Sequence, residues 1–446
     1  MSRRPFAPPA EPDSASVDVI EQVIRTLLTH LHPDEREGKP GRPRILPAAA
    51  LWGGVLVGIL RGMRSQLEIW RLLSELRLWD YPRFPVSDQA VYRRLATAGT
   101  APLEQLFAAT STVLQARLAP YVAEDLAPFA RDVVVLDETT LDRVARTLPV
   151  LREVPAGDDR MMPGKLAGVY DVRRQLWRHV TYLPDPHQNE KVAARDLAAT
   201  LAPHSLILAD LGYFGFAWFD DLTDAGHFWI SRERTRSSYT VVATLYAQGE
   251  TRDELVWLGA YRSDRAKHLV RRVQFRVNGT RSCYLTNVRD PERLSIAEIA
   301  RCYARRWDIE LAIKLAKREL GLHLFWSAKP TVVLQQVWGV LIIAQILHAL
   351  RLEIAGRAGV DPFDVSLPLL VRYLPRWAAQ GEDPIEQAVR RGTGMGVIRP
   401  SRRIVIQAPT PPLAAYTQPP PDLVVERTPR YARRNCGPRL VAYGCI

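Results

Sequence analysis

The stretch DVVVLDETT, residues 132–140, decides how the middle of the chain folds. Its four consecutive apolar residues, Val133 to Leu136, are typical of a central strand that is buried on both faces of a sheet. The apolar run ends at Asp137, and a carboxylate in that place is costly unless it has a partner or a cation. The stretch therefore predicts a buried strand that brings one acidic side chain to the edge of a sheet.

A second stretch, HSLILADLGYFG at residues 204–215, has the same form and ends its apolar run at Asp210. One such aspartate is ordinary, because Asp often caps a helix, but two are less so. The surrounding patterns predict a hairpin at 165–183, helices at 189–201 and 216–225, and a strand at 227–233. This order of strands and helices predicts a mixed sheet covered by helices.

A third acidic residue lies in YARRWDIELAIK, residues 303–314, which has the apolar spacing of a helix. Successive helical residues turn by about 100°, so Tyr303, Arg306, Glu310 and Lys317 project from a sector roughly 60° wide. Taken alone, an Arg306–Glu310 pair indicates an ordinary solvated helix face. If the two aspartate strands are neighbours and this helix lies across them, however, three carboxylates converge.

Such a cluster of carboxylates cannot remain fully ionised in a small space unless cations neutralise it. Oxygen ligands without Cys or His suit Mg²⁺ or Mn²⁺. Two such ions can activate water on one side of a phosphodiester and stabilise the leaving oxygen on the other. Arg306 and Lys317 are then suited to hold phosphates, and Tyr303 to contact the DNA backbone.

The overall composition favours a nucleic-acid partner. The 446 residues are enough for two or three domains, and 60 Lys and Arg against 48 Asp and Glu give a net charge of +12. A basic protein without such a partner is the alternative. The four cysteines have the spacing of neither a zinc site nor a disulfide framework. We find no signal peptide, and no apolar run reaches the ~18 residues that span a membrane. We therefore expect a cytoplasmic, nucleoid-associated protein.

The N-terminal part is predicted to be helical. Residues 1–45 form a flexible basic arm with one short helix, and GRPR at 41–44 suits a minor groove or is a plain basic linker. Residues 46–125 form a helical DNA-binding domain. In it, VSDQAVYRRLATAG has Ser87 as an N-cap and Arg93 and Arg94 for DNA contacts, although a surface helix of a small bundle has the same pattern.

The remaining boundaries follow from shifts in composition. Residues 126–329 form the catalytic core, in which short alternating runs at about 234–288 predict an antiparallel β insertion. Residues 330–394 are predicted to be C-terminal helices. Residues 395–446 are predicted to be a basic, irregular tail rich in Pro and Arg.

With these motifs, the sequence resembles DDE transposases of the bacterial insertion-sequence-four group. The group's signature Tyr-x2-Arg-x3-Glu-x6-Lys is matched at every spacing, and LDETT, ADLGYFGFAWFDDLTDAGHFWISR and YLTNVRD also read like the family, over about residues 50–350. The resemblance implies an α/β, ribonuclease-H-like catalytic core with a β-strand insertion, an all-α N-terminal domain and a helical C-terminal part. The residues that it implies for the site are Asp137, Asp210 and Glu310 as catalytic metal ligands and Tyr303, Arg306 and Lys317 as DNA contacts.

The resemblance also implies the reaction and the partners. The chain would use Mg²⁺, with Mn²⁺ able to substitute, to cleave the inverted repeats at transposon ends and join them to target DNA, as a dimer in the synaptic complex. Relatives that cut through a DNA hairpin have a Trp where this chain has Ser282, which leaves Tyr284 or Trp257 as base-stacking candidates. The rival interpretations are a catalytically silent DNA-binding protein derived from a transposase and a nuclease that cleaves without joining.

Overall fold

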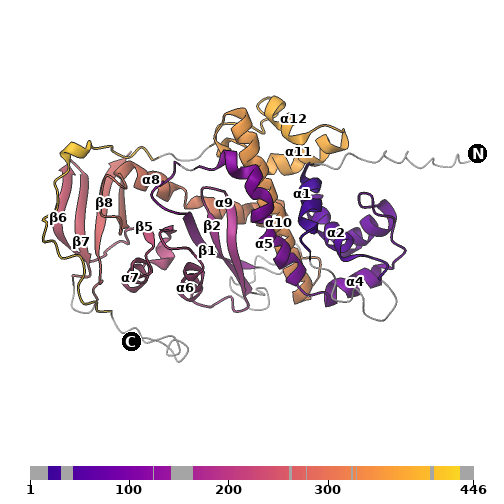
Figure 1. Cartoon of the computed structure of the whole chain (residues 1–446), viewed down its shortest axis with the longest axis horizontal. Helices are drawn as coiled ribbons and strands as arrows, with labels where there is room; N and C mark the ends of the chain where they lie inside the picture. The colour runs from indigo at the N-terminus through magenta and orange to yellow at the C-terminus, as the bar shows by residue number, and fades with distance from the viewer. Residues whose placement is uncertain are drawn as a thin grey trace, which may run out of the picture. The chain divides into compact units, whose positions relative to one another are not determined.

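The computed structural model describes residues 19–31, 44–123, 125–141, 164–260, 264–277, 279–322, 325–327, 329–401 and 406–431. These parts of the chain form two compact units (Figure 1). The helical unit draws on 1–121, 141–163 and 312–402, and the α/β unit on 122–140, 164–311 and 403–446. The predicted N-terminal and C-terminal helical parts, expected as separate regions, therefore belong to one unit.

The α/β unit is built on one sheet of nine strands in the order β3-β2-β1-β4-β5-β9-β8-β7-β6. The strands are β1 (Val133–Leu141), β2 (Gly164–Asp171), β3 (Leu176–Leu183), β4 (Leu206–Ala209), β5 (Phe228–Arg232), β6 (Tyr239–Gln248), β7 (Thr251–Leu258), β8 (Leu269–Val277) and β9 (Thr280–Thr286). The helices are α6 (Glu190–Ala199), α7 (Phe216–Asp224), α8 (Ile296–Ala304) and most of α9 (Trp307–Lys314). The mixed sheet, the β2–β3 hairpin and the two helices that follow it confirm the predicted order.

The strand directions place the two aspartate strands side by side. β1 runs parallel to β4, and β4 runs parallel to β5. Val135 of β1 is paired with Leu208 of β4. Two residues further along each strand, Asp137 and Asp210 therefore lie next to each other at the same edge of the sheet.

One face of the sheet is covered by α6 and α7, which lie side by side in Figure 1. Ala194 and Leu197 of α6 and Phe219 of α7 are buried in one cluster with Val134 of β1 and Ile207 of β4. Side chains alternate between the two faces of a strand. Asp137 and Asp210, three residues beyond Val134 and Ile207, therefore project from the opposite face.

The β insertion is antiparallel, as predicted, and it extends the core sheet. β9 pairs with β5 as well as with β8, so β6 to β9 continue the row of strands. Arg271 and Asp253 form an ion pair with both side chains 0% exposed, and Arg271 Nη1 also donates to the Leu294 carbonyl at 2.5 Å. This pair ties the insertion to the turn before α8.

The predicted C-terminal tail lies largely in the α/β unit. Residues 406–431 have little regular structure, as expected, but they pack along the insertion. The backbone N–H of Leu269 donates to the Val425 carbonyl at 2.9 Å, and the Arg427 guanidinium lies 4.6 Å from the ring centroid of Trp257. The Tyr431 hydroxyl donates to Asp220 at 2.6 Å. The tail is irregular because Pro and Arg do not form a helix or strand pattern, and its apolar residues and backbone groups have partners on the sheet.

The helical unit contains α1 (Val19–Leu28), α2 (Ala48–Leu60), α3 (Gln66–Arg71), α4 (Asp88–Thr97), α5 (Ala101–Leu118), α10 (Pro330–Ala358), α11 (Leu367–Ala379) and α12 (Pro384–Arg391). The predicted helix near the N-terminus is α1, but it is not part of a flexible arm. Its residues Ile20, Ile24 and Leu27 are 0% exposed and pack against α2 and α5. The rest of the predicted arm, apart from residues 29–31, Arg44 and Ile45, lies outside the described residues.

The long helix α10 is the core of the helical unit. It is long and apolar enough to cross a membrane, but 94% of its most apolar stretch is buried inside the protein, as in the core helix of a globular domain. Gly339 permits a close approach to α2, because a Cβ there would lie 2.5 Å from Ile59 Cδ1. The helices before and after the α/β unit thus depend on each other for their packing.

Candidate active site

The predicted acidic residues lie on three elements of the α/β unit. Asp137 lies inside β1, where the buried part of the strand gives way to half-buried residues, because the strand runs on to Leu141 instead of ending at the carboxylate. Asp210 follows β4 directly and caps a short 3₁₀ turn. Glu310 lies in the first turn of α9.

Arg306 joins two of these carboxylates. Its Nη2 atom lies 2.8 Å from Glu310 Oε1, and its Nε atom lies 3.5 Å from Asp210 Oδ1. The arginine side chain is 10% exposed, whereas the carboxylate side chains are 40% exposed for Asp210 and 35% for Glu310. The guanidinium is therefore held in the interior, and the acidic groups on either side of it face solvent in part.

The charges in this region influence one another. The pKa of Asp137 is raised to about 6, chiefly by burial. The Glu138 backbone N–H and Arg306 lower this pKa, and the negative charges of Asp210 and Glu310 raise it. Burial disfavours the charged form of Arg306, but the neighbouring carboxylates of Asp210 and Glu310 prevail and raise its pKa. Perturbed groups of this kind are typical of functional sites.

The helix that carries the signature is not continuous, which corrects the sequence prediction. α8 ends at Ala304, residues 305 and 306 form a turn, α9 begins at Trp307, and Leu315–Glu319 form a π-helical turn. The rotation of about 100° per residue is lost at the first break and changed again in the π turn. The common sector predicted for Tyr303, Arg306, Glu310 and Lys317 therefore does not describe the structure, although Arg306 and Glu310 do meet.

A buried network fixes the break between α8 and α9. Asp308 is 1% exposed, and its Oδ2 atom accepts hydrogen bonds from Gln175 Nε2 at 2.8 Å and from Arg305 Nε at 2.6 Å. Arg305 Nη2 also donates to the Val172 carbonyl at 3.1 Å. The start of α9 is thus tied to the β2–β3 hairpin, which determines where Arg306 and Glu310 are held.

The two predicted tyrosines lie in the interior. Tyr303 is 6% exposed, its hydroxyl donates to the Ala209 carbonyl at 3.4 Å, and burial raises its pKa to about 12. Tyr284 is 2% exposed, and its ring lies 5.2 Å from that of Tyr303 and 5.9 Å from that of Phe275. Neither ring presents a free face, so the structure gives Tyr284 no surface for a base, and the Trp257 ring is covered by Arg427.

The other predicted DNA contacts belong to the helical unit. Lys317 is half-buried in the π turn after α9. On α4, Ser87 is the N-cap, as predicted, and accepts a hydrogen bond from the Ala90 N–H at 3.2 Å. Arg93 is exposed, whereas Arg94 is half-buried and donates to the Leu46 carbonyl. The two neighbouring arginines therefore have different surroundings.

Two features beside the carboxylates were missed in the sequence. Trp307 is 58% exposed, and the Arg306 guanidinium lies 5.1 Å from its ring centroid; Leu311, one turn on, is 40% exposed. Glu138 forms a buried ion pair with Lys165, whose ammonium group also donates to the Gln188 carbonyl at 2.5 Å. Trp307 was detectable as an aromatic residue on the polar side of an amphipathic helix, but the partner of Glu138 depends on strand pairing.

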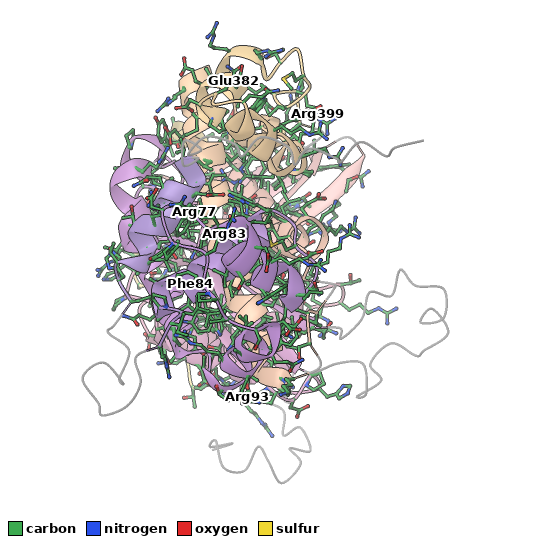
Figure 2. All side chains as sticks on the ribbon, turned by 90° about the vertical axis from the view of Figure 1, so that its right-hand side faces the viewer. Arg77, Arg83, Phe84, Arg93, Glu382 and Arg399 are labelled. Atoms are coloured by element: carbon green, nitrogen blue, oxygen red, sulfur yellow. The ribbon has the colours of Figure 1, made fainter. Side chains whose placement is uncertain are left out.

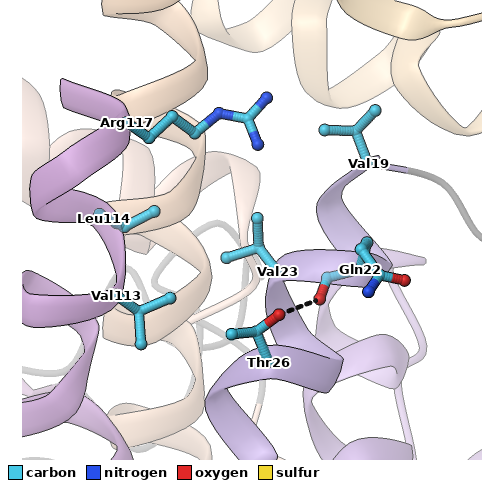
Figure 3. A pocket seen from close by; sticks show the side chains of 7 residues that line it. All are labelled: Val19, Gln22, Val23, Thr26, Val113, Leu114 and Arg117. Carbon is cyan, nitrogen blue, oxygen red and sulfur yellow. Dashed lines mark hydrogen bonds between the residues drawn. The ribbon is translucent and has the colours of Figure 1, made fainter.

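A groove of about 480 Å³ lies elsewhere, between α1 and α5 of the helical unit (Figure 3). Its lining is mainly apolar, with Val23, Val113 and Leu114, and its basic residue Arg117 is bonded to Glu353 at 2.5 Å. Among the described residues, no group of three or more His, Cys, Asp and Glu side chains is close enough to hold a metal ion.

Comparison with known proteins connects this region to DNA transposition. Residues 130–346, just under half of the chain, match a family model described as "Transposase DDE domain". No curated protein matches the chain. Among solved structures, the cryo-EM structure of the piggyBac transposase synaptic complex with hairpin DNA is similar at 10% identity, covering 87% of this chain and 86% of that one with a TM-score of 0.39, which is too low to support an argument.

The matched region contains β1, β4, α8 and α9, and with them Asp137, Asp210, Arg306 and Glu310. The site described above therefore lies entirely within the part of the chain to which the comparison applies. The match supports a DDE transposase.

Proposed function

We propose that this protein is a cut-and-paste DNA transposase of the insertion-sequence-four group, which cleaves at transposon ends and joins the freed 3′ ends to target DNA. The observation that carries the proposal is that Asp210, directly after β4, and Glu310 of α9 both bond Arg306, and that the charges of all three influence the pKa of Asp137 on β1. These elements lie in the region that matches a transposase DDE domain. A mixed sheet with parallel β1, β4 and β5 and an antiparallel hairpin is consistent with a ribonuclease-H-like core.

In this proposal, Asp137, Asp210 and Glu310 are the catalytic residues and the ligands of Mg²⁺, for which Mn²⁺ can substitute. Their chemistry fits such ions, because the donors are all carboxylate oxygens and the charged form of Asp137 is disfavoured until a cation compensates it. Bound Mg²⁺ would supply Lewis-acid activation of water and of the leaving oxygen.

Arg306 is proposed to exchange its partners when DNA binds. A guanidinium that is bonded to a carboxylate has the planar geometry and charge to bind a phosphate in the same way. If the scissile strand offers that phosphate, Glu310 is released to act in the reaction. Tyr303, buried beneath, would then position Arg306 and the end of β4 through its bond to Ala209 instead of contacting the DNA backbone itself.

Trp307 and Leu311 extend the proposed DNA surface. An exposed aromatic ring beside the carboxylates offers an apolar face against which a base or a deoxyribose can pack, and such stacking is typically worth about 1–3 kcal/mol per base. The buried rings of Tyr284 and Tyr303 do not offer this. The stacking role predicted for Tyr284 thus passes to a residue on α9 in our proposal.

The remaining partners are proposed from the same chemistry. The net charge of +12 suits DNA, which would be bound at the terminal inverted repeats and at the target, with a dimer in the synaptic complex. The protein would act in the cytoplasm on the nucleoid. The helical unit is proposed to recognise the transposon end.

The experiment that tests the proposal is a strand-transfer assay with pre-cut end DNA taken from the sequence that flanks the gene. The protein should nick uncut ends in Mg²⁺ and should join pre-cut ends to a target plasmid. A protein that binds the ends but neither nicks nor joins them would be the silent DNA-binding derivative. A protein that nicks but does not join would be a nuclease without strand transfer.

A further inference from the structure

We propose that α4 is the helix that reads the base sequence of duplex DNA, with Gln89 and Arg93 as base-reading residues, and that the surrounding arginines contact phosphates. This inference rests on the proposed function and deepens it, because it assigns end recognition to named side chains. It also divides the predicted Arg93–Arg94 pair into one residue that contacts DNA and one that holds the helix in place.

The position at which α4 begins is firmly held. Trp70 Nε1 donates to the Val86 carbonyl at 2.8 Å, and the Phe84 N–H donates to the Leu73 carbonyl at 3.0 Å. Ser87 then caps the helix. Two hydrogen bonds to the preceding helical segment and one cap therefore fix the first turn of α4, which is a requirement for a helix that has to present side chains in register with base pairs.

The two sides of α4 differ sharply in exposure. Val91 and Leu95 are each 1% exposed and form the buried side. Gln89 and Arg93, one turn apart, are exposed on the other side. Gln89 is the second and Arg93 the sixth of the ten residues of α4. The N-terminal residues of a recognition helix are the ones that reach base edges in the major groove, and Arg93 lies one turn further along the same exposed side as Gln89.

The side chains at these positions have the chemistry of base recognition. An arginine can donate two hydrogen bonds to guanine O6 and N7, and a glutamine can bond adenine N6 and N7. The positive end of the helix dipole at the start of α4 favours a nearby phosphate. Arg94, in contrast, bonds the Leu46 carbonyl before α2, so its guanidinium is occupied in joining α4 to the rest of the unit.

The surface around α4 is basic. Arg71, Arg77 and Arg83, from α3 and the segment between α3 and α4, are all exposed. Figure 2 shows Arg77, Arg83 and Arg93 on the side of the helical unit that faces the viewer. Of the nearby acids, Asp80 is bonded to Arg25, Glu75 is exposed, and Asp88 is half-buried in the first turn of α4. This charge complements a phosphate backbone, and phosphate contacts fix the register of a protein on a duplex.

The test begins with selection of bound sequences from a pool of random 30-bp duplexes at one stated salt concentration. The parental protein should select a consensus. Arg93→Ala and Gln89→Ala should each lose the preference at one base pair and keep the others, with about 10- to 100-fold weaker binding to the parental consensus. Arg83→Ala should weaken binding to all sequences alike and reduce the salt slope by about one.

The control is Arg399→Ala. Arg399 is an exposed arginine that Figure 2 shows at the opposite end of the helical unit from Arg93. Its removal should leave the consensus unchanged, and the thermal unfolding of all variants should match that of the parental protein because the substituted side chains are exposed. Arg94→Ala should instead lower the unfolding temperature.

The outcomes separate the two proposals. If Arg93→Ala and Gln89→Ala select the parental consensus with parental affinity, α4 does not read the bases, whatever the enzyme does to DNA. If the protein selects a consensus that depends on these residues but neither nicks nor joins DNA, the inference on α4 stands and the proposed transposase activity is wrong.

Discussion

The carboxylate site and the surface of α4 differ in how their charged side chains are placed. At the site, Arg306 is 10% exposed and is bonded to Glu310, and the start of α9 is locked by the buried Asp308 network. On α4, Arg93 and Gln89 are exposed above a buried apolar side. At the carboxylate site the charged groups bond one another, whereas on α4 the polar side chains project from a helix into solvent.

This difference separates what substitutions in each region should do. Buried, mutually bonded groups act strongly because the local dielectric constant is low and their geometry is fixed in advance. Exposed charges contribute less each, are screened by salt, and act on binding. Substitutions at the site should therefore change the chemical step and stability, and substitutions on exposed surfaces should change affinity.

Glu310→Gln should have the largest effect. It keeps the shape of the side chain and removes the charge, so we expect end cleavage in Mg²⁺ to slow by roughly 10²–10⁴-fold, since losing one ligand removes several kcal/mol of stabilisation at about 1.4 kcal/mol per tenfold change in rate. Binding, measured by gel shift in Ca²⁺, should be kept. A variant that cleaves at nearly the parental rate would show that α9 does not contribute the third carboxylate.

Asp308, another acid on α9, is an unsuitable substitute for Glu310 because Gln175 and Arg305 occupy its buried carboxylate. Glu319 lies in the π turn of the helical unit and is exposed. A cleaving Glu310→Gln variant would therefore direct attention to Glu138, the other carboxylate next to Asp137.

Asp137→Asn should stabilise the protein while it slows end cleavage. The pKa of Asp137 rises from 3.8 to about 6 on folding, and each pKa unit corresponds to 1.36 kcal/mol, so the charged form costs the folded state at most about 3 kcal/mol. A raised carboxyl pKa lowers stability as pH rises from about 4 to about 6. The increase in the free energy of unfolding that Asp137→Asn produces should thus be complete above pH 6 and absent below pH 4.

This prediction is checked by urea unfolding in EDTA, without DNA, at several pH values. Asp221→Asn is a suitable control, because Asp221 is half-exposed in an ion pair with Arg195 on α7 and α6, away from the carboxylates. An equal increase in the free energy of unfolding at pH 4 and pH 7.5 would mean that the charge of Asp137 does not destabilise the folded protein.

Asp308→Asn should have an intermediate effect. It keeps the volume but weakens the charged hydrogen bond from Arg305, so α9 should be held less precisely. Loss of an outer partner of a site typically costs about 10- to 100-fold in metal affinity or activity. We expect a higher Mn²⁺ concentration for half-maximal cleavage and unchanged DNA affinity, both of which a general loss of stability would not produce.

The control for Asp308 is Asp125→Asn, which removes an exposed ion pair with Arg301 of α8. Because surface ion pairs contribute little, this variant should behave like the parental protein. If the two variants have the same Mn²⁺ dependence, the network does not position the site.

The sequence predicted the parts of the site that depend on local pattern. The buried strands that lead to Asp137 and Asp210, the hairpin at 165–183 and the cap at Ser87 are all set by residues that are close in sequence. The break at residues 305–306 was not predicted, since its cause is a set of long-range bonds to Gln175 and Val172. A continuous apolar stripe gives no sign of them.

A sequence pattern could also not predict that the N-terminal helices pack against α10, which is distant in the chain. The separate N-terminal domain was a reasonable expectation, because its helices are contiguous, but α10 supplies their core. Deletion of residues 1–125, which would test end recognition in a modular protein, would here expose the apolar surface of α10. Point substitutions on α4 are therefore the appropriate test of recognition.

Lys317→Ala should have the smallest effect, because Lys317 belongs to the signature but not to the α/β unit that carries the carboxylates. It lies half-buried in the π turn, in the helical unit. If it contacts one phosphate, its loss should weaken end binding several-fold and reduce the salt slope by about one, while cleavage at saturating DNA stays near the parental rate. Arg318→Ala, at the exposed neighbouring position, is the matched control and should leave the salt slope unchanged. Equal salt slopes for the two variants would mean that Lys317 contacts phosphate no more than a neighbouring basic residue does. A large loss of the cleavage rate at saturating DNA would instead mean that Lys317 takes part in the chemical step.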